Sequence, residues 1–161
     1  MDVTKIKAGK LDLNFEIVSI NHLVDDVIHD LSSTIGSHRI IKIGGIISKV
    51  RCDENRIKQV LNNLLTNAVK YSMAAEKEVV TVSEDDRNIQ VDIHDFGMGI
   101  AKENLPKVFD RFFRAHGTDS GMLSSLGLGL YISTDIIKRH SGKIWVESVV
   151  GQVQPFIFYC R

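Results

Sequence analysis

The chain has 161 residues, which is enough for one domain with a substantial hydrophobic core and too few to expect two. Hydrophobic residues make up 43% and charged residues 25%, as in an ordinary folded domain, and the formal net charge is zero, so no overall field attracts nucleic acid or an anionic membrane. No apolar run approaches the roughly 20 residues that cross a bilayer, the first residues lack the apolar core of a signal peptide, and Cys52 and Cys160 lack the spacing of a metal site.

The first third of the chain predicts a mixture of strands and helices. The first ten residues are basic and weakly periodic, and we interpret them as the end of a helix from an upstream domain, finishing near Gly9. Local patterns then predict, in chain order, a strand over residues 11–17, a helix capped by Asn21, and a hairpin of residues 39–43 and 46–51 around Gly44-Gly45.

The rest of the chain continues the mixture. Asp53 is expected to cap a long helix over residues 54–71. The later elements are strands at 79–83 and 89–94, a short helix at 102–108, a region of little periodicity at 115–126, a helix from about 127 to 141 with Gly142 at its C′ position, and strands at 143–148 and 156–159. This pattern predicts an α+β protein, a two-layer α/β sandwich with a mixed, largely antiparallel sheet covered by helices on one face.

The helix over residues 54–71 carries a narrow polar stripe. At about 100° per residue, Asn63, Asn67 and Lys70 lie within about 60° of one another, and apolar residues fill the other side. A plain amphipathic helix also has a solvated stripe, but such stripes favour Glu, Lys and Arg, whereas asparagine is a poor helix former. Two asparagines one turn apart indicate oxygen ligands for a hard cation such as Mg²⁺.

Two glycine-containing stretches also have the character of a ligand site. Asp95 follows a strand and begins Asp95-Phe96-Gly97-Met98-Gly99-Ile100, where a carboxylate can accept a hydrogen bond and the glycines allow close approach of the backbone. Leu126-Gly127-Leu128-Gly129-Leu130 opens a helix, whose free N–H groups favour phosphate. The structural alternatives are a capped turn for the first stretch and a flexible hinge for the second.

A fourth stretch lies between these two. Residues 108–113 contain three phenylalanines that suit a core contact beneath a loop, and Arg114 follows them at the edge of the aperiodic region. A planar guanidinium there can reach a phosphate, although an arginine beside aromatic residues is more often a packing residue at the surface.

The order and spacing of these stretches resemble the nucleotide-binding domain shared by histidine kinases, gyrase-type ATPases and Hsp90-like chaperones. Residues 63–72 look like the N box of the kinases, the Asp95 turn like the first Gly box, residues 109–113 like the F box, and the Gly127 segment like the second Gly box. The resemblance runs from about Leu11 to Tyr159. It implies an ATP-binding catalytic domain at 11–161, preceded at 1–10 by a linker or the end of a dimerisation helix.

The resemblance implies that the chain binds ATP and Mg²⁺. Asp95 would accept a hydrogen bond from the adenine amino group, and Tyr71 would flank the adenine or ribose. Asn67 and Asn63 would hold Mg²⁺, and the residues implied in phosphoryl transfer are Arg114, Lys70 and Asn63. The remaining residues expected to contact the nucleotide are Gly97, Gly99, Ile100, Ser125, Leu126, Gly127, Leu128, Gly129 and Leu130.

The resemblance also implies partners and a cellular setting. The phosphate acceptor would be a histidine on a separate helical domain, because none of the six histidines here has the acidic residue and downstream proline of the acceptor motif. The chain alone is therefore not expected to autophosphorylate. The implied partners are its own dimerisation and phosphotransfer domain and a downstream response regulator, with no nucleic acid and no membrane contact. The domain itself is expected to be monomeric and cytoplasmic, with or without a membrane anchor on the parent protein.

Two alternative functions remain on the same fold. Ser125-Leu126 stand where the family usually has Gly-Thr, which favours a non-enzymatic nucleotide-sensing module. A serine kinase of the anti-sigma-factor type is the other alternative, and an acceptor histidine motif upstream of Asp2 would discriminate against it. Strong ATP hydrolysis is not expected, since gyrase-type relatives place a water-activating glutamate where Asn63 stands and an amide cannot take up a proton.

Overall fold

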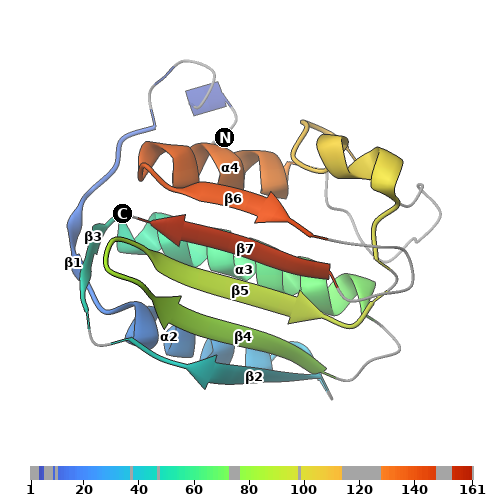
Figure 1. Cartoon of the computed structure of the whole chain (residues 1–161), viewed down its shortest axis with the longest axis horizontal. Helices are drawn as coiled ribbons and strands as arrows, with labels where there is room; N and C mark the ends of the chain where they lie inside the picture. Colours follow the sequence, from blue (N-terminus) through green and yellow to red (C-terminus); the bar gives the residue numbers. More distant parts are fainter. Residues whose placement is uncertain are drawn as a thin grey trace.

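The computed structural model describes residues 4–5, 9, 11–36, 38–46, 48–72, 77–97, 99–113, 128–147 and, for the backbone alone, 154–160. Five strands form one sheet in the order β2-β4-β5-β7-β6 (Figure 1). Their bounds are β2 Arg39–Gly44, β4 Lys77–Glu84, β5 Ile89–Asp95, β6 Lys143–Val146 and β7 Gln154–Cys160. The β2–β4 pair is parallel and the other three pairs are antiparallel.

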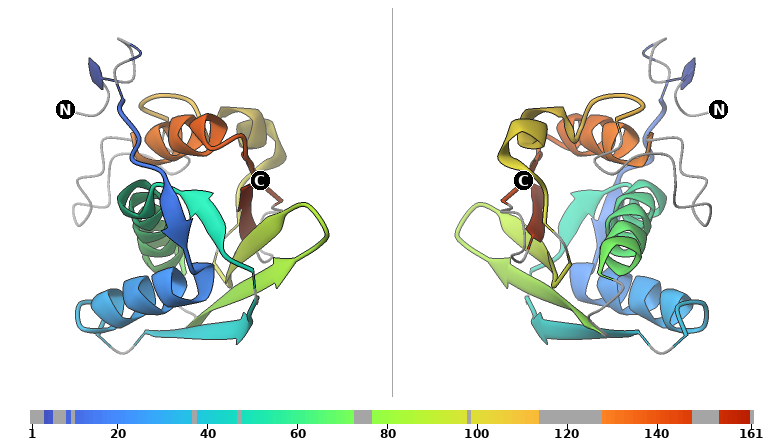
Figure 2. Two further views of the ribbon diagram at one scale, coloured as in Figure 1. Left: turned by 90° about the vertical axis from the view of Figure 1, so that its left-hand side faces the viewer. Right: turned by 90° about the vertical axis from the view of Figure 1, so that its right-hand side faces the viewer.

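Three α-helices cover one face of this sheet, as the side views show most clearly (Figure 2). They are α2 Ile20–Ser32, α3 Glu54–Tyr71 and α4 Gly129–Arg139. A 3₁₀ helix, η1 Lys102–Lys107, stands where a short helix was expected, and β1 Glu16–Val18 pairs with β3 Val50–Cys52 in a small separate sheet. The predicted two-layer sandwich with a mixed, largely antiparallel sheet is therefore confirmed.

The core lies between α3 and the sheet. Asp53 caps α3 as predicted, because its side chain accepts a hydrogen bond from the backbone N–H of Arg56. Alternate residues of β4 and β5 point into the core, as the period of a strand requires. The residues of these three elements that are at most 2% exposed include Ile57, Val60, Leu61, Leu64, Leu65, Val80, Val82, Val91 and Ile93.

The prediction of a hairpin around Gly44-Gly45 is wrong. Strand β2 pairs in parallel with β4, whereas β3 pairs with β1. Gly44 has φ 77°, and a Cβ atom there would collide with the carbonyl oxygen of Val82. The glycine therefore permits close approach to β4 and does not form a two-strand turn.

Two expectations near the N-terminus are also corrected. Ser19, not Asn21, caps α2, and its side chain accepts a hydrogen bond from the N–H of His22. Asn21 instead bonds the backbone of Ile46, which lies 25 residues later, through both ends of its amide. The strand expected over residues 11–17 is limited to β1 at Glu16–Val18.

The C-terminal end of α4 differs from the prediction by one residue. Ser141 has φ 57°, so the serine, not Gly142, occupies the left-handed C′ position. The N–H of Ser141 bonds the carbonyl of Lys138, and the N–H of Gly142 bonds that of Ile137. These two bonds form a Schellman motif that has a serine where glycine is usual.

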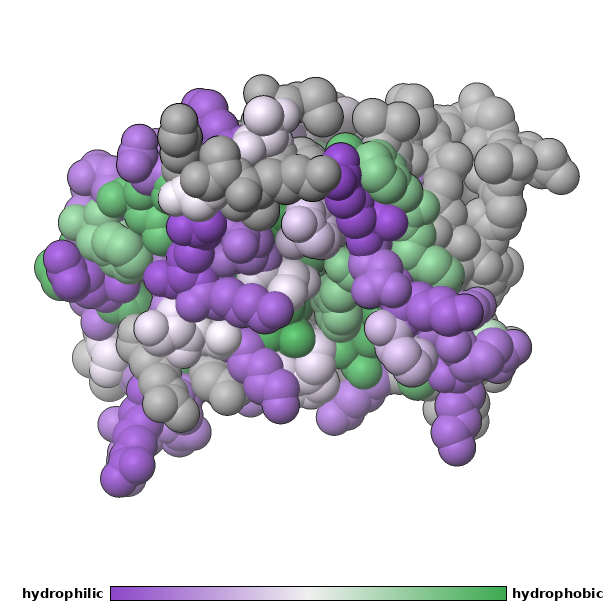
Figure 3. Space-filling view, turned by 90° about the horizontal axis from the view of Figure 1, so that it is seen from above, coloured by the Kyte–Doolittle hydropathy of each residue, from purple (hydrophilic) through white to green (hydrophobic). Residues whose placement is uncertain are grey.

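Hydrophilic and apolar side chains are interspersed over the described part of the upper surface (Figure 3). Among the described residues, no helix combines the length and the apolar character needed to cross a membrane.

Candidate nucleotide-binding site

The polar stripe of α3 meets the start of α4 at Asn63. The Nδ2 of Asn63 donates a hydrogen bond to Ser133 Oγ at 3.0 Å, across 70 residues of sequence. Gly129, the first residue of α4, lies so close to Asn63 that a Cβ atom on it would collide with the Asn63 Oδ1. The structure therefore brings together two residues that the sequence placed in separate motifs.

The beginning of α4 has the features expected of an anion site. Leu128 is at the N-cap position, no side-chain hydrogen bond from the described residues caps the helix there, and its first turn contains no acidic residue. The first N–H groups of a helix have no partner within the helix, and the helix dipole favours negative charge beside them. Leu128 is buried, and Gly129 and Leu130 follow it with intermediate exposure.

Asp95 ends β5 at the other end of the stripe. Its side chain is fully buried, and its Oδ1 accepts a hydrogen bond of 2.9 Å from the N–H of Gly97. A Cβ atom on Gly97 would collide with the carbonyl oxygen of Tyr71, the last residue of α3, so only glycine lets this loop pack against the helix end. Gly99 has φ 72°, and Ile100 is buried in the core cluster.

The other two stripe residues have intermediate exposure. Asn67 lies one turn after Asn63. Lys70 lies near the end of α3, and its Nζ is 5.2 Å from the centroid of the Tyr71 ring. Amide oxygens on one helix face fit a cation that takes most of its oxygen ligands from phosphate and water. Among the described residues, no group of three or more His, Cys, Asp or Glu side chains is placed to hold a metal ion.

The phenylalanine segment is only partly in the core. Phe109 and Phe113 are half-buried and pack against the core cluster, as predicted. Phe112 is 55% exposed and has φ 63°, and the guanidinium of Arg111 lies 4.6 Å from its ring centroid. Arg114, Ser125, Leu126 and Gly127 lie outside the described residues.

A cluster of three polar side chains that the sequence did not single out lies beneath the C-terminal end of α3. Glu78 of β4 is fully buried, and its Oε1 lies 2.5 Å from Ser72 Oγ and 3.3 Å from His38 Nε2. Burial raises the pKa of the Glu78 carboxyl above its ordinary value, although Ser72 and His38 act in the opposite direction. Only the apolar neighbours of Glu78 in β4 hinted in the sequence that this carboxyl would be buried.

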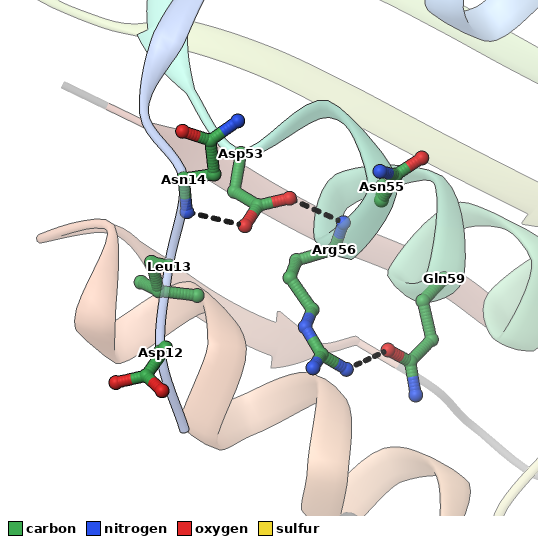
Figure 4. Close-up of a pocket in the computed structure, with 7 residues that line it drawn as sticks. All are labelled: Asp12, Leu13, Asn14, Asp53, Asn55, Arg56 and Gln59. Carbon is green, nitrogen blue, oxygen red and sulfur yellow. Dashed lines mark hydrogen bonds between the residues drawn. The ribbon is translucent and has the colours of Figure 1, made fainter. Parts of the chain in front are cut away.

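The opposite end of α3 forms a cavity of about 360 Å³ with the N-terminal segment (Figure 4). Asp53 Oδ2 accepts a hydrogen bond of 2.8 Å from the N–H of Asn14, and Arg56 Nη1 donates to Gln59 Oε1. The N–H of Asp53 donates to the Nε2 of buried His140, which confirms the interpretation of His140 as a structural histidine. These contacts join three segments and lie far along α3 from Asp95.

Residues 52–161 match the family model described as the histidine kinase-, DNA gyrase B- and HSP90-like ATPase. The chain belongs to this ATPase family. Hybrid signal transduction histidine kinase L of Dictyostelium discoideum is 32% identical over 165 residues, which cover 97% of this chain and 10% of that protein. Sensor histidine kinase WalK of Bacillus subtilis is 36% identical over 111 residues, covering 68% of this chain and 18% of that protein. The chain thus spans a fifth or less of these relatives.

Solved structures agree with this assignment to the histidine kinase-like ATPases. Full-length ShkA in complex with AMPPNP is 25% identical, with a TM-score of 0.83 over 98% of this chain and 33% of that one. The catalytic domain of histidine kinase ThkA is 29% identical, with a TM-score of 0.75 over 92% of this chain and 95% of that one. The family expected from the four motifs is confirmed, and the chain corresponds to the ATPase domain of its kinase relatives.

Proposed function

We propose that this chain is the ATP-binding catalytic domain of a two-component sensor histidine kinase. The main observation behind the proposal is that both glycine-containing stretches pack against the same face of α3. Asn63 contacts Gly129 at the start of α4, and Tyr71 contacts Gly97 of the Asp95 loop. These two positions are about 12 Å apart along the helix, which separates a phosphate end from a base end on one surface.

Asp95 is the residue proposed to read the base. Its buried carboxylate is held by Gly97 and can accept a hydrogen bond from an exocyclic amino group, which adenine has and guanine lacks at that edge. Ile100 would pack beside the base, and Tyr71 would flank it. This arrangement selects ATP over GTP.

The phosphates are proposed to lie between Asn63, Asn67 and the start of α4. When bound, Mg²⁺ would neutralise charge on the phosphate oxygens, with Asn67 and Asn63 supplying amide oxygens to it. The first N–H groups of α4, at Leu128–Leu130, would bind phosphate oxygens, and Lys70 would contribute a positive charge. Arg114 is proposed to stabilise the γ-phosphoryl group during its transfer.

The proposed reaction transfers the γ-phosphoryl group to a histidine on another domain. Phosphoryl transfer needs chiefly positioning and charge neutralisation, which this domain would supply, whereas the nucleophile would come from a helical phosphotransfer domain of the same protein. A response regulator would then receive the phosphoryl group. Residues 1–10 would form the linker to the phosphotransfer domain, and the domain would act as a monomer in the cytoplasm.

Replacing Asp95 by asparagine tests the base site. The variant keeps the shape of the side chain but loses the charged acceptor, so ATP affinity should fall by about 1.5–3 kcal/mol, or roughly 10- to 150-fold. Isothermal titration calorimetry measures the change directly. Asp92→Asn is a matched control, because Asp92 lies in the same strand on the opposite face, where its carboxylate accepts hydrogen bonds from the nearby Gln90 amide.

An unchanged ATP affinity in Asp95→Asn would refute the base-reading role. The kinase reaction itself is tested by giving radiolabelled ATP to the parent protein and then to this chain mixed with the upstream domain. Label on a histidine of that domain is the expected result. Nucleotide binding without any transfer would instead favour the nucleotide-sensing module suggested by Ser125-Leu126.

A further inference from the structure

We propose that Ser133 is a positioning residue that orients the amide of Asn63 for binding of the metal–nucleotide complex. The inference rests on the proposed function and adds a residue to it. Ser133 lies in α4 one turn after Gly129 and is 1% exposed, and its Oγ is 3.0 Å from the Nδ2 of Asn63.

The orientation of Asn63 matters because the two ends of an amide have similar shapes and opposite chemistry. The oxygen can bind a cation, whereas the NH₂ group can only donate hydrogen bonds. In the structure the NH₂ group donates to Ser133 Oγ, and of the Asn63 atoms Oδ1 lies nearest to the position that a Gly129 Cβ atom would take. With its NH₂ group on Ser133, the amide thus turns its oxygen toward the start of α4, where the phosphates are proposed to bind.

Gly129 and Ser133 confine the same side chain from two sides. The absence of a Cβ atom at Gly129 makes room for Oδ1, and the buried hydroxyl of Ser133 engages Nδ2. Residues four apart on a helix lie on the same face, so both contacts come from one face of α4. Partners that orient a ligand side chain typically change metal affinity by 10- to 100-fold when they are removed.

Ser133→Ala tests this role in the present chain. The affinity for AMPPNP is measured by calorimetry in the presence of Mg²⁺ and again in EDTA. We expect about a tenfold loss with Mg²⁺ and a change of less than about twofold in EDTA. Ser133→Thr keeps the hydroxyl and should retain most of the Mg²⁺-dependent affinity, and Ser133→Cys, a weak acceptor of similar size, should behave like alanine.

Thr134→Ala provides the matched control. Thr134 is the next residue of α4, and its hydroxyl donates to the carbonyl of Leu130 within the same helix at 2.8 Å, so its loss should leave the Mg²⁺ dependence unchanged. A double-mutant cycle isolates the route of action. In an Asn63→Ala background, Ser133→Ala should cause no further loss, since its effect acts through Asn63.

The outcomes separate the two proposals. If the wild-type chain binds AMPPNP and Ser133→Ala retains the same Mg²⁺ dependence, the positioning role is overturned and the nucleotide site stands. The role is also overturned if Ser133→Ala weakens binding equally in the Asn63→Ala background. If the wild-type chain binds no nucleotide with or without Mg²⁺, both the proposed function and this inference are wrong.

Discussion

At the scale of single residues, the contact between Ser72 and Glu78 is informative because of its proton count. Ser72 Oγ lies 2.8 Å from the carbonyl oxygen of Ala68 and 2.5 Å from Glu78 Oε1, but a hydroxyl has only one proton. The hydroxyl can therefore donate to only one of these two oxygens at a time. Burial of the Glu78 carboxyl beneath the end of α3 raises its pKa.

The raised pKa has a predictable effect on stability. Below the ordinary value of 4.5 the carboxyl is protonated in both the folded and the unfolded chain, so its pKa makes no difference there. As the pH rises through the folded pKa, the unfolded chain releases its proton first, and folding then loses about 1.4 kcal/mol for each unit of the shift. Glu78→Gln should therefore be more stable than wild type at neutral pH, with a difference that shrinks toward pH 4.5.

Urea unfolding at several pH values between 4.5 and 8 measures this difference. The matched control is Glu103→Gln, because Glu103 is an exposed glutamate of η1. It should change the free energy of unfolding by less than about 0.5 kcal/mol across the range. Equal pH dependence in wild type and Glu78→Gln would show that the buried carboxyl carries its charge in the folded protein.

The residues discussed above differ in how clearly the sequence marks them. In the proposed site, Asn63 and Asp95 can be singled out from the sequence, because asparagine is a poor helix former and because Asp95 ends a strand directly before two closely spaced glycines. Ser133 breaks no rule that a short window can detect, and Glu78 is marked only by the apolar residues beside it in β4. A serine inside a helix usually bonds its own backbone, and only the packing of α4 on α3 gives Ser133 a partner 70 residues away.

At the scale of elements, residue patterns located most helices and strands but not the partner of each strand. The sequence pattern predicts β2 with nearly its observed bounds, but it pairs β2 with the next strand in the sequence. Its true partner β4 follows only after β3 and α3, because a parallel pair requires a crossover. The close approach of Gly44 to Val82 and the bonds from Asn21 to Ile46 are long-range contacts, and no local pattern contains them.

The end of α4 offers a stability prediction at this scale. Ser141 adopts a left-handed conformation that costs a residue with a Cβ atom roughly 1 kcal/mol. Ser141→Gly should raise the free energy of unfolding by about 0.5–1 kcal/mol, since the Schellman bonds of Ser141 and Gly142 come from the backbone and remain. Urea unfolding at fixed pH measures this gain.

The matched control for this variant is at the end of α2. Ser33 is the C-cap residue there and has φ −74°, a right-handed conformation that any residue adopts. Ser33→Gly should lower the free energy of unfolding, because glycine gains nothing in the folded state and loses more backbone freedom on folding. If both glycine variants lower the free energy of unfolding by the same amount, the left-handed conformation of Ser141 does not destabilise the protein.

At the scale of the whole molecule, the N-terminal segment connects helix ends that are far apart in sequence. Asn14 bonds Asp53 at the start of α3, and Asp53 bonds His140 at the end of α4. The ring of Phe15 lies 5.1 Å from that of His140, and Leu11 is 4% exposed in the core cluster. This packing supports the prediction that the domain begins near Leu11, although the family match begins only at residue 52.

Truncation tests where the domain begins. A chain that starts at Leu11 keeps these contacts, and its free energy of unfolding should differ from that of the full chain by less than about 0.5 kcal/mol. A chain that starts at Ser19 loses buried Leu11 and Val18, the Asn14–Asp53 bond and the β1–β3 pairing, and each buried aliphatic residue alone is worth about 2–5 kcal/mol. Leu11→Ala in the full chain should reproduce part of that loss. If removing residues 1–10 costs as much as removing 1–18, the first ten residues are part of the folded domain rather than a linker to the domain before it.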